Sequence, residues 1–379
     1  MAPALSPRLA AGLAAGLLVA TAGTSAADQG HDNGKHKGQE KNKLAPAAPA
    51  YDFCSGGGAA RELTLTVEGQ RATGLYAVPK GKAKGLVVFA HGYGHTAESW
   101  RKHLTNTAAR NGVIAVAMNY RGEIITPPDK SKGQTRPTSR GWQVAEGAAD
   151  SNAAARLIER RCSGLTTVVL YGVSMGGNTA GLALAAKPTR ASGAPLYDYW
   201  FQMEGANNVV ETYFGARALK ASGNATAVNA VEDIEREMGG TFEQKRDLYL
   251  ERSVVNRVAD IAESGVKGIV MMHGVGDGLV PYNQSRELQA RLATAGLLVE
   301  VHSFTLRAAS SEPGTTVDGY LPNPTGAYTS PLSGHASEAS DTHEQNVAGF
   351  ERLSETFGGR PACEGERVYV AGERLYLGC

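Results

Sequence analysis

The sequence predicts an α/β fold with a mostly parallel central sheet and helices on both of its faces. Short apolar runs without polar alternation recur along the chain, as in Leu86–Ala90 and Thr167–Tyr171, and such runs are typical of strands buried on both faces. Stretches with helical spacing separate these runs, and strands that alternate with helices form parallel sheets. A chain of 379 residues with 42% hydrophobic residues is long enough to bury the core that this fold requires.

The strands and helices follow one another in a regular order. Two alternating runs, Arg61–Val67 and Ala72–Val78, predict antiparallel strands at a sheet edge. Buried strands are then expected at Leu86–Ala90, Val113–Met118, Thr167–Tyr171, Tyr199–Met203, Gly268–Met272 and Leu298–Phe304. Helices are expected at Ala97–Asn111, Gly141–Arg160, Gly177–Ala186, Ser253–Ser264, Ser285–Ala295 and Ser337–Glu355.

Two insertions interrupt this alternation. Residues 207–251 carry two or three helical patterns and no strand, so we expect a helical cap over the carboxyl edge of the sheet. Residues 308–333 are polar and rich in Pro and Gly, and loops of this length are often functional.

The first 27 residues have the pattern of an export signal. Arg8 gives a positive start, Leu9–Ala20 is apolar, and Thr24–Ala27 offers the small residues of a cleavage site. A membrane anchor is the alternative, but the apolar run has only about half of the ~20 residues needed to span a bilayer. Residues 28–50 lack periodicity and are typical of a disordered linker. We therefore expect a secreted protein with one folded domain over residues 51–379 and no membrane segment after signal cleavage.

The cysteines are expected to form disulfides if the protein is exported. Cys54, Cys162, Cys363 and Cys379 allow three pairings. Alternating runs predict a small hairpin over about residues 363–379, which a Cys363–Cys379 bridge would hold together. The pair Cys54–Cys162 then follows by elimination.

Charge and motif content exclude several classes of function. The formal net charge is +1, so no basic surface for nucleic acid or an anionic membrane is expected. The cysteines lack the C-x-x-C spacing of a zinc site. Gly274, Gly276 and Gly278 do not continue into a dinucleotide fingerprint. We expect neither a metal nor an organic cofactor.

A candidate nucleophile lies in the pentapeptide Gly172–Gly176, which reads G-x-S-x-G around Ser174. The motif alone is weak evidence in a chain with 47 glycines. Here it follows the strand Thr167–Tyr171 and precedes a helical run, the context of a nucleophile elbow that lifts the Ser Oγ above the sheet. We therefore predict that Ser174 is the nucleophile.

A second motif, His91–Gly94, follows the buried strand Leu86–Ala90. Acyl transfer needs two backbone N–H groups aimed at the developing oxyanion. We predict that Tyr93 supplies one and that Met175, the residue after the nucleophile, supplies the other. His91 is then a structural residue of this loop and not the base.

The acid that orients the base is expected at the end of a strand beyond the elbow. Asp277 lies in the loop that follows Gly268–Met272 and is the predicted acid. Glu204, at the end of the strand Tyr199–Met203, is the alternative.

The base is expected beyond the acid. His335 stands at the end of the long polar insertion, where a loop that crosses the carboxyl edge of the sheet can reach Ser174, and it is the predicted base. His302 lies inside the last predicted strand and His343 inside the last predicted helix, and both remain alternatives.

The order Ser174, Asp277, His335, with His-Gly upstream, resembles the α/β-hydrolase superfamily. The resemblance extends over about residues 61–355 and includes Asn119–Gly122, which is similar to the family's turn after this strand. It implies an α/β-hydrolase fold and a Ser-His-Asp triad. Within the superfamily, the chain is similar to secreted bacterial esterases and lipases and to the catalytic domains of prolyl-oligopeptidase and dienelactone-hydrolase relatives.

The Tyr93 and Met175 pair is similar to the oxyanion pair of bacterial cutinases. The cap and the long loop before His335 depart from compact cutinases, which puts an open polymer-binding cleft in doubt.

The predicted function is cleavage of carboxylic esters through an acyl-enzyme, by a secreted monomer acting on a small-molecule or lipid-like ester. Aromatic residues in and near the cap either line an acyl pocket or pack in the core: Tyr197, Tyr199, Trp200, Tyr213 and Phe214. A secreted peptidase or amidase on the same triad is the alternative. An acidic pair that binds a peptide amino terminus would favour it, with candidates Glu211, Glu232 and Glu235 in the cap. A non-enzymatic binding protein would lack a triad member, and none is missing.

Overall fold

The computed structural model describes residues 51–221, 223, 225–305, 335–370 and 373–377. The predicted export signal, the linker and the 308–333 insertion lie outside the described residues, as does Cys379. Among the described residues, no helix combines the length and the apolar character that crossing a bilayer requires.

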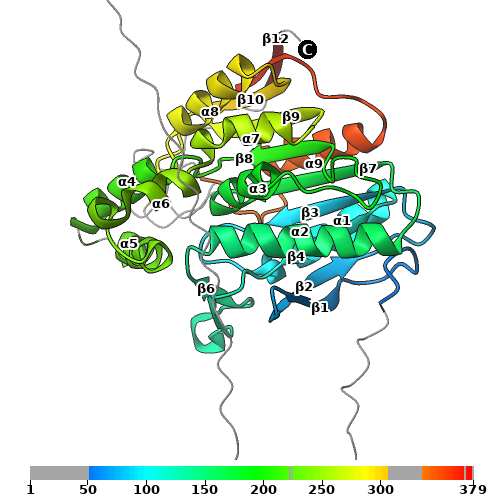
Figure 1. Ribbon diagram of the computed structural model, residues 1–379, viewed down its shortest axis with the longest axis horizontal. Coiled ribbons are helices and arrows are strands. Elements are labelled where there is room, and N and C mark those ends of the chain that lie inside the picture. The colour runs from blue at the N-terminus through cyan, green and yellow to red at the C-terminus, as the bar shows by residue number, and fades with distance from the viewer. Residues whose placement is uncertain (1–50, 222, 224, 306–334, 371–372, 378–379) are drawn as a thin grey trace, which may run out of the picture. The chain divides into compact units, whose positions relative to one another are not determined.

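The central sheet has ten strands, and its middle is parallel (Figure 1). From one edge to the other the order is β1, β2, β4, β3, β7, β8, β9, β10, β11, β12. Neighbouring strands from β4 to β11 pair in parallel, whereas β1, β2 and β12 pair antiparallel at the two edges. The strands are β1 (Arg61–Val67), β2 (Gln70–Ala77), β3 (Gly85–Ala90), β4 (Ile114–Met118), β7 (Thr167–Val173), β8 (Tyr199–Met203), β9 (Gly268–Gly274), β10 (Val299–Thr305), β11 (Gly365–Val370) and β12 (Glu373–Leu377).

Helices cover both faces of the sheet and produce two separate cores. In β3, Leu86 and Val88 face one core and Val87 and Phe89 face the other, as the twofold alternation of a strand requires. The helices α1 (Arg101–Asn111) and α9 (Glu344–Phe357) pack on one face. The other face is covered by α2 (Val144–Arg161), α3 (Met175–Ala185), α7 (Val258–Glu263) and α8 (Tyr282–Thr294) (Figure 1).

Three helices occupy the insertion between β8 and β9: α4 (Val209–Ala221), α5 (Ala225–Met238) and α6 (Phe242–Arg252). Figure 1 shows them grouped at one end of the sheet, beside the short hairpin of β5 (Ile124–Thr126) and β6 (Thr138–Arg140). That hairpin was not expected, because strands of three residues are too short to show a hydrophobic period.

The helix predicted over 97–111 begins with a 3-10 turn at Ala97–Trp100, and two other predicted helices differ more from the structure. The stretch predicted as Ser253–Ser264 consists of a 3-10 turn at Val254–Asn256 and the short α7. The last helix begins at Glu344 rather than at Ser337, because the His343 side chain accepts the Gln345 N–H and caps the helix.

The C-terminal hairpin of β11 and β12 is present and extends the main sheet, because β11 pairs in parallel with β10. Cys54 and Cys162 form the predicted disulfide, with a Cα–Cα distance of 5.4 Å. The predicted bridge from Cys363 to Cys379 involves a residue outside the described part of the chain.

Candidate active site

Ser174 occupies a sharp turn between β7 and α3. Its φ of 55° and ψ of −124° are unusual for a residue with a side chain, and such conformations cluster at functional sites. The turn depends on the flanking glycines. A Cβ at Gly172 would lie 2.1 Å from the Gly176 carbonyl oxygen, and one at Gly176 would lie 2.2 Å from the Ala90 carbonyl oxygen. The glycines of G-x-S-x-G are therefore required by the close approach of three backbone segments.

The His91–Gly94 loop lies directly beside this serine. A Cβ built on Gly92 would lie 3.4 Å from the Ser174 Cβ. Among the described residues, no acceptor takes a hydrogen bond from the backbone N–H of Tyr93 or of Met175. Met175 is the first residue of α3, where the N–H groups lack intrahelical partners and the helix dipole favours negative charge. The two N–H groups predicted to bind an oxyanion are thus free to do so.

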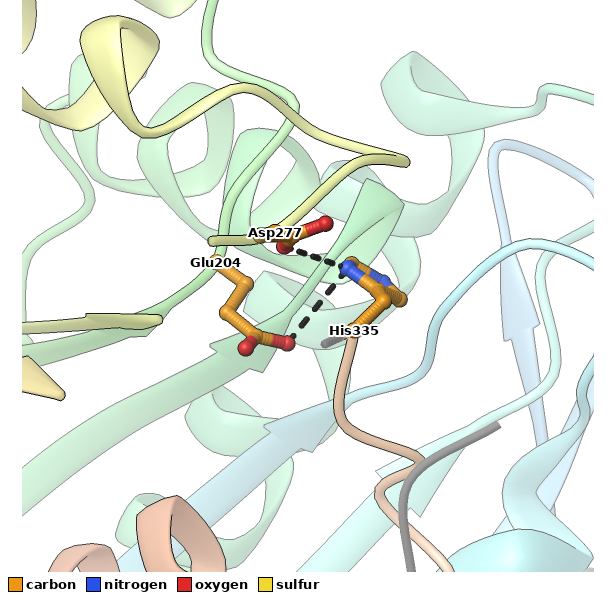
Figure 2. Close-up of side chains that lie close together, drawn as sticks. All are labelled: Glu204, Asp277 and His335. Atoms are coloured by element: carbon orange, nitrogen blue, oxygen red, sulfur yellow. Dashed lines mark hydrogen bonds and ion pairs between the residues drawn. The ribbon is translucent and has the colours of Figure 1, made fainter. Parts of the chain in front are cut away.

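Asp277 and His335 are in direct contact (Figure 2). The distance from His335 Nδ1 to Asp277 Oδ2 is 2.7 Å, and both residues are buried. The other oxygen of Asp277 accepts the backbone N–H groups of Leu279 at 2.8 Å and Val280 at 3.0 Å. His273 Nε2 lies 3.3 Å from Asp277 Oδ2. Burial alone would raise the pKa of Asp277, but the charge of His335 and the hydrogen bonds from His273 and His335 hold it well below its usual range.

Glu204 is a second carboxylate on the same imidazole (Figure 2). Its Oε2 lies 3.4 Å from His335 Nδ1 and accepts the backbone N–H of Ala336 at 2.8 Å. Its Oε1 contacts the Gln345 side-chain amide. By the shorter distance, Asp277 is the hydrogen-bonded partner of His335, and Glu204 holds the backbone of Ala336 next to it.

The three buried groups affect one another's protonation. Burial raises the pKa of Glu204, and this effect together with the nearby Asp277 outweighs the opposite effect of His335. Burial alone would lower the pKa of His335, but Asp277 and Glu204 outweigh it and the pKa is raised. The possible ligand atoms of these residues lie within 4.8 Å of one another. Both carboxylates, however, already accept backbone N–H groups, so the arrangement is suited to holding a charged imidazole.

Glu338, which the sequence did not single out, links the base loop to the oxyanion loop. It is only 2% exposed, and its Oε1 accepts the Gly92 N–H at 2.9 Å and lies 2.7 Å from His95 Nδ1. Burial alone would raise the pKa of Glu338, but His95 and the Gly92 N–H lower it to about 2. Ser174 lies against Gly92, so this carboxylate connects the surroundings of Ser174 and His335. Among the described residues, no hydrogen bond joins Ser174 Oγ to the His335 ring; in unliganded sites such bonds are often long.

The alternative histidines have other roles. His302 contacts Glu300 at 2.8 Å and Tyr369 at 3.1 Å inside the sheet. His343 was expected inside the last helix; it is instead the buried N-cap of α9. His91 is buried and stacked on Tyr120, and burial lowers its pKa to about 4, consistent with a structural residue of the loop.

Residues 87–261 match the alpha/beta hydrolase family. No curated protein matches the chain at a significant level. An esterase from Rhizomucor miehei has a similar structure, with 13% identity, a TM-score of 0.52 and coverage of 79% of this chain and 83% of that one. An esterase from Pyrobaculum calidifontis is similar at 14% identity and a TM-score of 0.51, with coverage of 80% and 86%.

Acylaminoacyl peptidase from Pyrococcus horikoshii is also similar, at 16% identity and a TM-score of 0.51, over 80% of this chain. The match spans only 42% of that peptidase, so this chain corresponds to less than half of it. At sequence identities this low, the similarity to these solved structures shows a shared fold and not a shared activity. Together with the family match over residues 87–261, the sheet order and the elbow, it shows that the chain has the fold of an α/β hydrolase.

Proposed function

We propose that the protein is a secreted serine hydrolase that cleaves carboxylic esters through an acyl-enzyme on Ser174. The observation that carries this proposal is the buried hydrogen bond of 2.7 Å between His335 and Asp277, at the same sheet edge as the strained elbow. Ser174 follows β7 and Asp277 follows β9, and parallel strands place their carboxyl ends together.

Each group has one chemical task in this mechanism. Ser174 Oγ attacks the acyl carbonyl carbon, and His335 accepts its proton at Nε2. Asp277 holds the opposite nitrogen, Nδ1, in its protonated form and stabilises the imidazolium that results. The N–H groups of Tyr93 and Met175 bind the oxyanion. His335 then protonates the leaving alcohol and activates the water that hydrolyses the acyl-enzyme.

The contacts of the cap acids favour an ester over a peptide substrate. Glu235 accepts a hydrogen bond of 2.6 Å from Tyr213, and Glu211 accepts one of 2.8 Å from Asn283. Glu232 lies 3.4 Å from Arg140. Each of these three carboxylates therefore has a partner among the described residues: Glu235 inside the cap, Glu211 on α8 and Glu232 on β6. These contacts argue against their use as a pair that binds a peptide ammonium.

Three of the aromatic residues near the cap are buried, in line with core packing, which the sequence left open beside an acyl pocket. Tyr197 and Trp200 are buried in the core, and the Tyr197 hydroxyl donates to Asn152. Tyr213 packs against Tyr249 inside the cap, at a ring distance of 5.0 Å. Phe214 is 42% exposed and remains a candidate for contact with an apolar acyl group.

Secretion and substrate class complete the proposal. The Cys54–Cys162 disulfide supports an oxidising compartment, as the export-signal pattern does. The near-neutral charge argues against nucleic acid or an anionic membrane as a partner. We propose a small-molecule or lipid-like ester as the substrate of a monomer that needs no cofactor.

The test combines covalent labelling with a substrate panel. A fluorophosphonate should label Ser174, as mapped by peptide mass spectrometry, and p-nitrophenyl esters should be cleaved faster than aminoacyl-p-nitroanilides. Labelling at another residue would contradict the nucleophile. Faster cleavage of the anilides would assign a peptidase or amidase to the same site.

A further inference from the structure

The side chain of Tyr93 is fixed by the cap. Its hydroxyl donates a hydrogen bond of 2.5 Å to Asp233 Oδ2, across 140 residues of sequence. Asp233 lies on α5 and is fully buried, and the Tyr93 ring packs near Trp142 at a centroid distance of 5.8 Å. The phenol of this predicted oxyanion residue is therefore occupied by a contact within the protein.

Asp233 joins three parts of the molecule. Arg140, at the end of β6, donates to it from Nε at 2.7 Å and from Nη2 at 3.0 Å. The backbone N–H of Gly141 donates to it at 3.1 Å, and Arg236 pairs with it from the next turn of α5. A buried carboxylate needs hydrogen-bonding or charged partners. The Asp233 carboxylate finds them in the loop of Tyr93, at the end of β6 and on its own helix α5.

The neighbours of Tyr93 are held differently. Gly92 donates its N–H to Glu338 at 2.9 Å, and the Gly94 carbonyl accepts the Ser139 N–H at 3.0 Å. The Ser139 hydroxyl donates to the His95 carbonyl at 2.6 Å. The backbone on both sides of Tyr93 is thus fixed, whereas Tyr93 itself is anchored through its side chain. That leaves its own N–H free.

We propose that Asp233 is a positioning residue that, through the Tyr93 phenol, aims the Tyr93 N–H at the oxyanion and so couples the cap to stabilisation of the transition state. This inference rests on the proposed function, because it requires Tyr93 to be an oxyanion donor. The physical reason is distance: a donor is effective only within about 2.7–3.1 Å of the oxyanion, and misplacement by about 1 Å can cost about a hundredfold in rate.

Tyr93→Phe is the direct test, because it removes only the phenol oxygen and keeps the backbone N–H. With a p-nitrophenyl ester we expect kcat to fall about tenfold to a hundredfold while KM changes little. A boronic acid that forms a tetrahedral adduct with Ser174 should lose affinity by a similar factor. A residue that only stabilises the fold would change the melting temperature without this selective loss. Asp233→Asn, which keeps the side-chain volume, should lower kcat in the same direction.

Tyr213→Phe is the matched control. It removes a tyrosine–carboxylate hydrogen bond of similar length, 2.6 Å from Tyr213 on α4 to Glu235. Glu235 is on α5, as Asp233 is, but this bond joins two cap helices and does not reach the His91–Gly94 loop. Its kcat should equal that of the wild type. An unchanged kcat in Tyr93→Phe, or an equal loss in both variants, would overturn the inference while leaving the esterase intact. A wild type that neither cleaves esters nor is labelled at Ser174 would overturn the proposed function and this inference with it.

Discussion

Two clusters of charged groups that contain buried carboxylates flank the elbow, and their compositions are opposite. Around His335, two carboxylates face one imidazole, at 2.7 Å from Asp277 and 3.4 Å from Glu204. Around Asp233, one carboxylate faces the guanidinium groups of Arg140 and Arg236. Guanidinium groups stay protonated at any pH at which proteins are folded, whereas imidazole titrates near neutrality. The charges of the cap cluster therefore stay constant with pH, whereas His335 can lose its proton, as the proposed mechanism requires.

The comparison also separates catalysis from stability. Loss of a group in the His335 cluster should act on the chemical step, because that cluster handles the proton. Loss of a contact in the Asp233 cluster should act on the placement of a donor. A change that is remote from both clusters and from the elbow should affect the free energy of unfolding alone.

The largest effect is expected for the nucleophile and the base. Ser174→Ala and His335→Ala should each lower kcat by about 10⁴- to 10⁶-fold, because the reacting groups act as a unit. His343→Ala is the control on the same segment. It removes the N-cap of α9, which should lower the free energy of unfolding by about 0.5–2 kcal/mol and leave kcat near wild type. Steady-state kinetics and chemical denaturation of the three variants test which histidine is the base. An inactive His343→Ala beside an active His335→Ala would assign the base to His343.

The second-largest effect on kcat should distinguish the two carboxylates that contact His335. Asp277→Asn should lower kcat about 10⁴-fold, because an amide in place of the acid selects the wrong imidazole tautomer. Glu204→Gln should cost far less, because its oxygen is the more distant one and an amide carbonyl can still accept the Ala336 N–H. Steady-state kinetics with one ester suffice. The reverse ranking would show that the acid follows β8 rather than β9.

A smaller effect concerns pH. The raised pKa of His335 places its loss of charge above the usual imidazole value of about 6.5, and only the neutral form can act as a base. The kcat/KM of the wild type should therefore rise with pH through a limb that lies above about 6.5. Asp277, Glu204 and Glu338 are the negative groups that raise the pKa of His335.

Glu204→Gln removes one of these charges, stabilises the imidazolium less and should move that limb to lower pH. Glu232→Gln removes an exposed cap carboxylate 3.4 Å from Arg140 and should leave the limb in place. Profiles of kcat/KM against pH for the three proteins measure the shift. A limb that does not move in Glu204→Gln would show that this carboxylate is uncharged where His335 titrates.

The smallest effect on turnover is expected from the disulfide. Replacing Cys54 and Cys162 by alanine should lower the free energy of unfolding by about 2–5 kcal/mol, because a bridge between distant residues restricts the unfolded chain. The bridge lies apart from both clusters, so kcat at 25 °C should stay near the wild-type value. Thermal melts beside ester kinetics test this. A large loss of kcat in a folded double variant would tie the bridge to the site.

The sequence alone determined the features that depend on local pattern. Strands β1 and β8 begin and end at the predicted residues, and the ends of most other strands in the main sheet differ from the prediction by one or two residues. The agreement is close because a buried strand is a short apolar run with clear limits. The elbow around Ser174 was visible because three backbone segments can approach so closely only at glycine. The positions of Asp277 and His335 followed from the ends of strands and from their order along the chain.

Only the tertiary structure decided the contacts that hold these groups. Glu338 meets Gly92 across 246 residues and Asp233 meets Tyr93 across 140, and no local period marks either acid. Asp233 lies between Glu232 and Ile234 in a helix rich in acids, so its sequence resembles a solvated face although it is fully buried. His343 and the pairing of β11 with β10 were decided in the same way. A hydrogen bond between distant segments forms only where the fold of the whole chain places them side by side. The spacing of residues along the sequence does not predict such a contact.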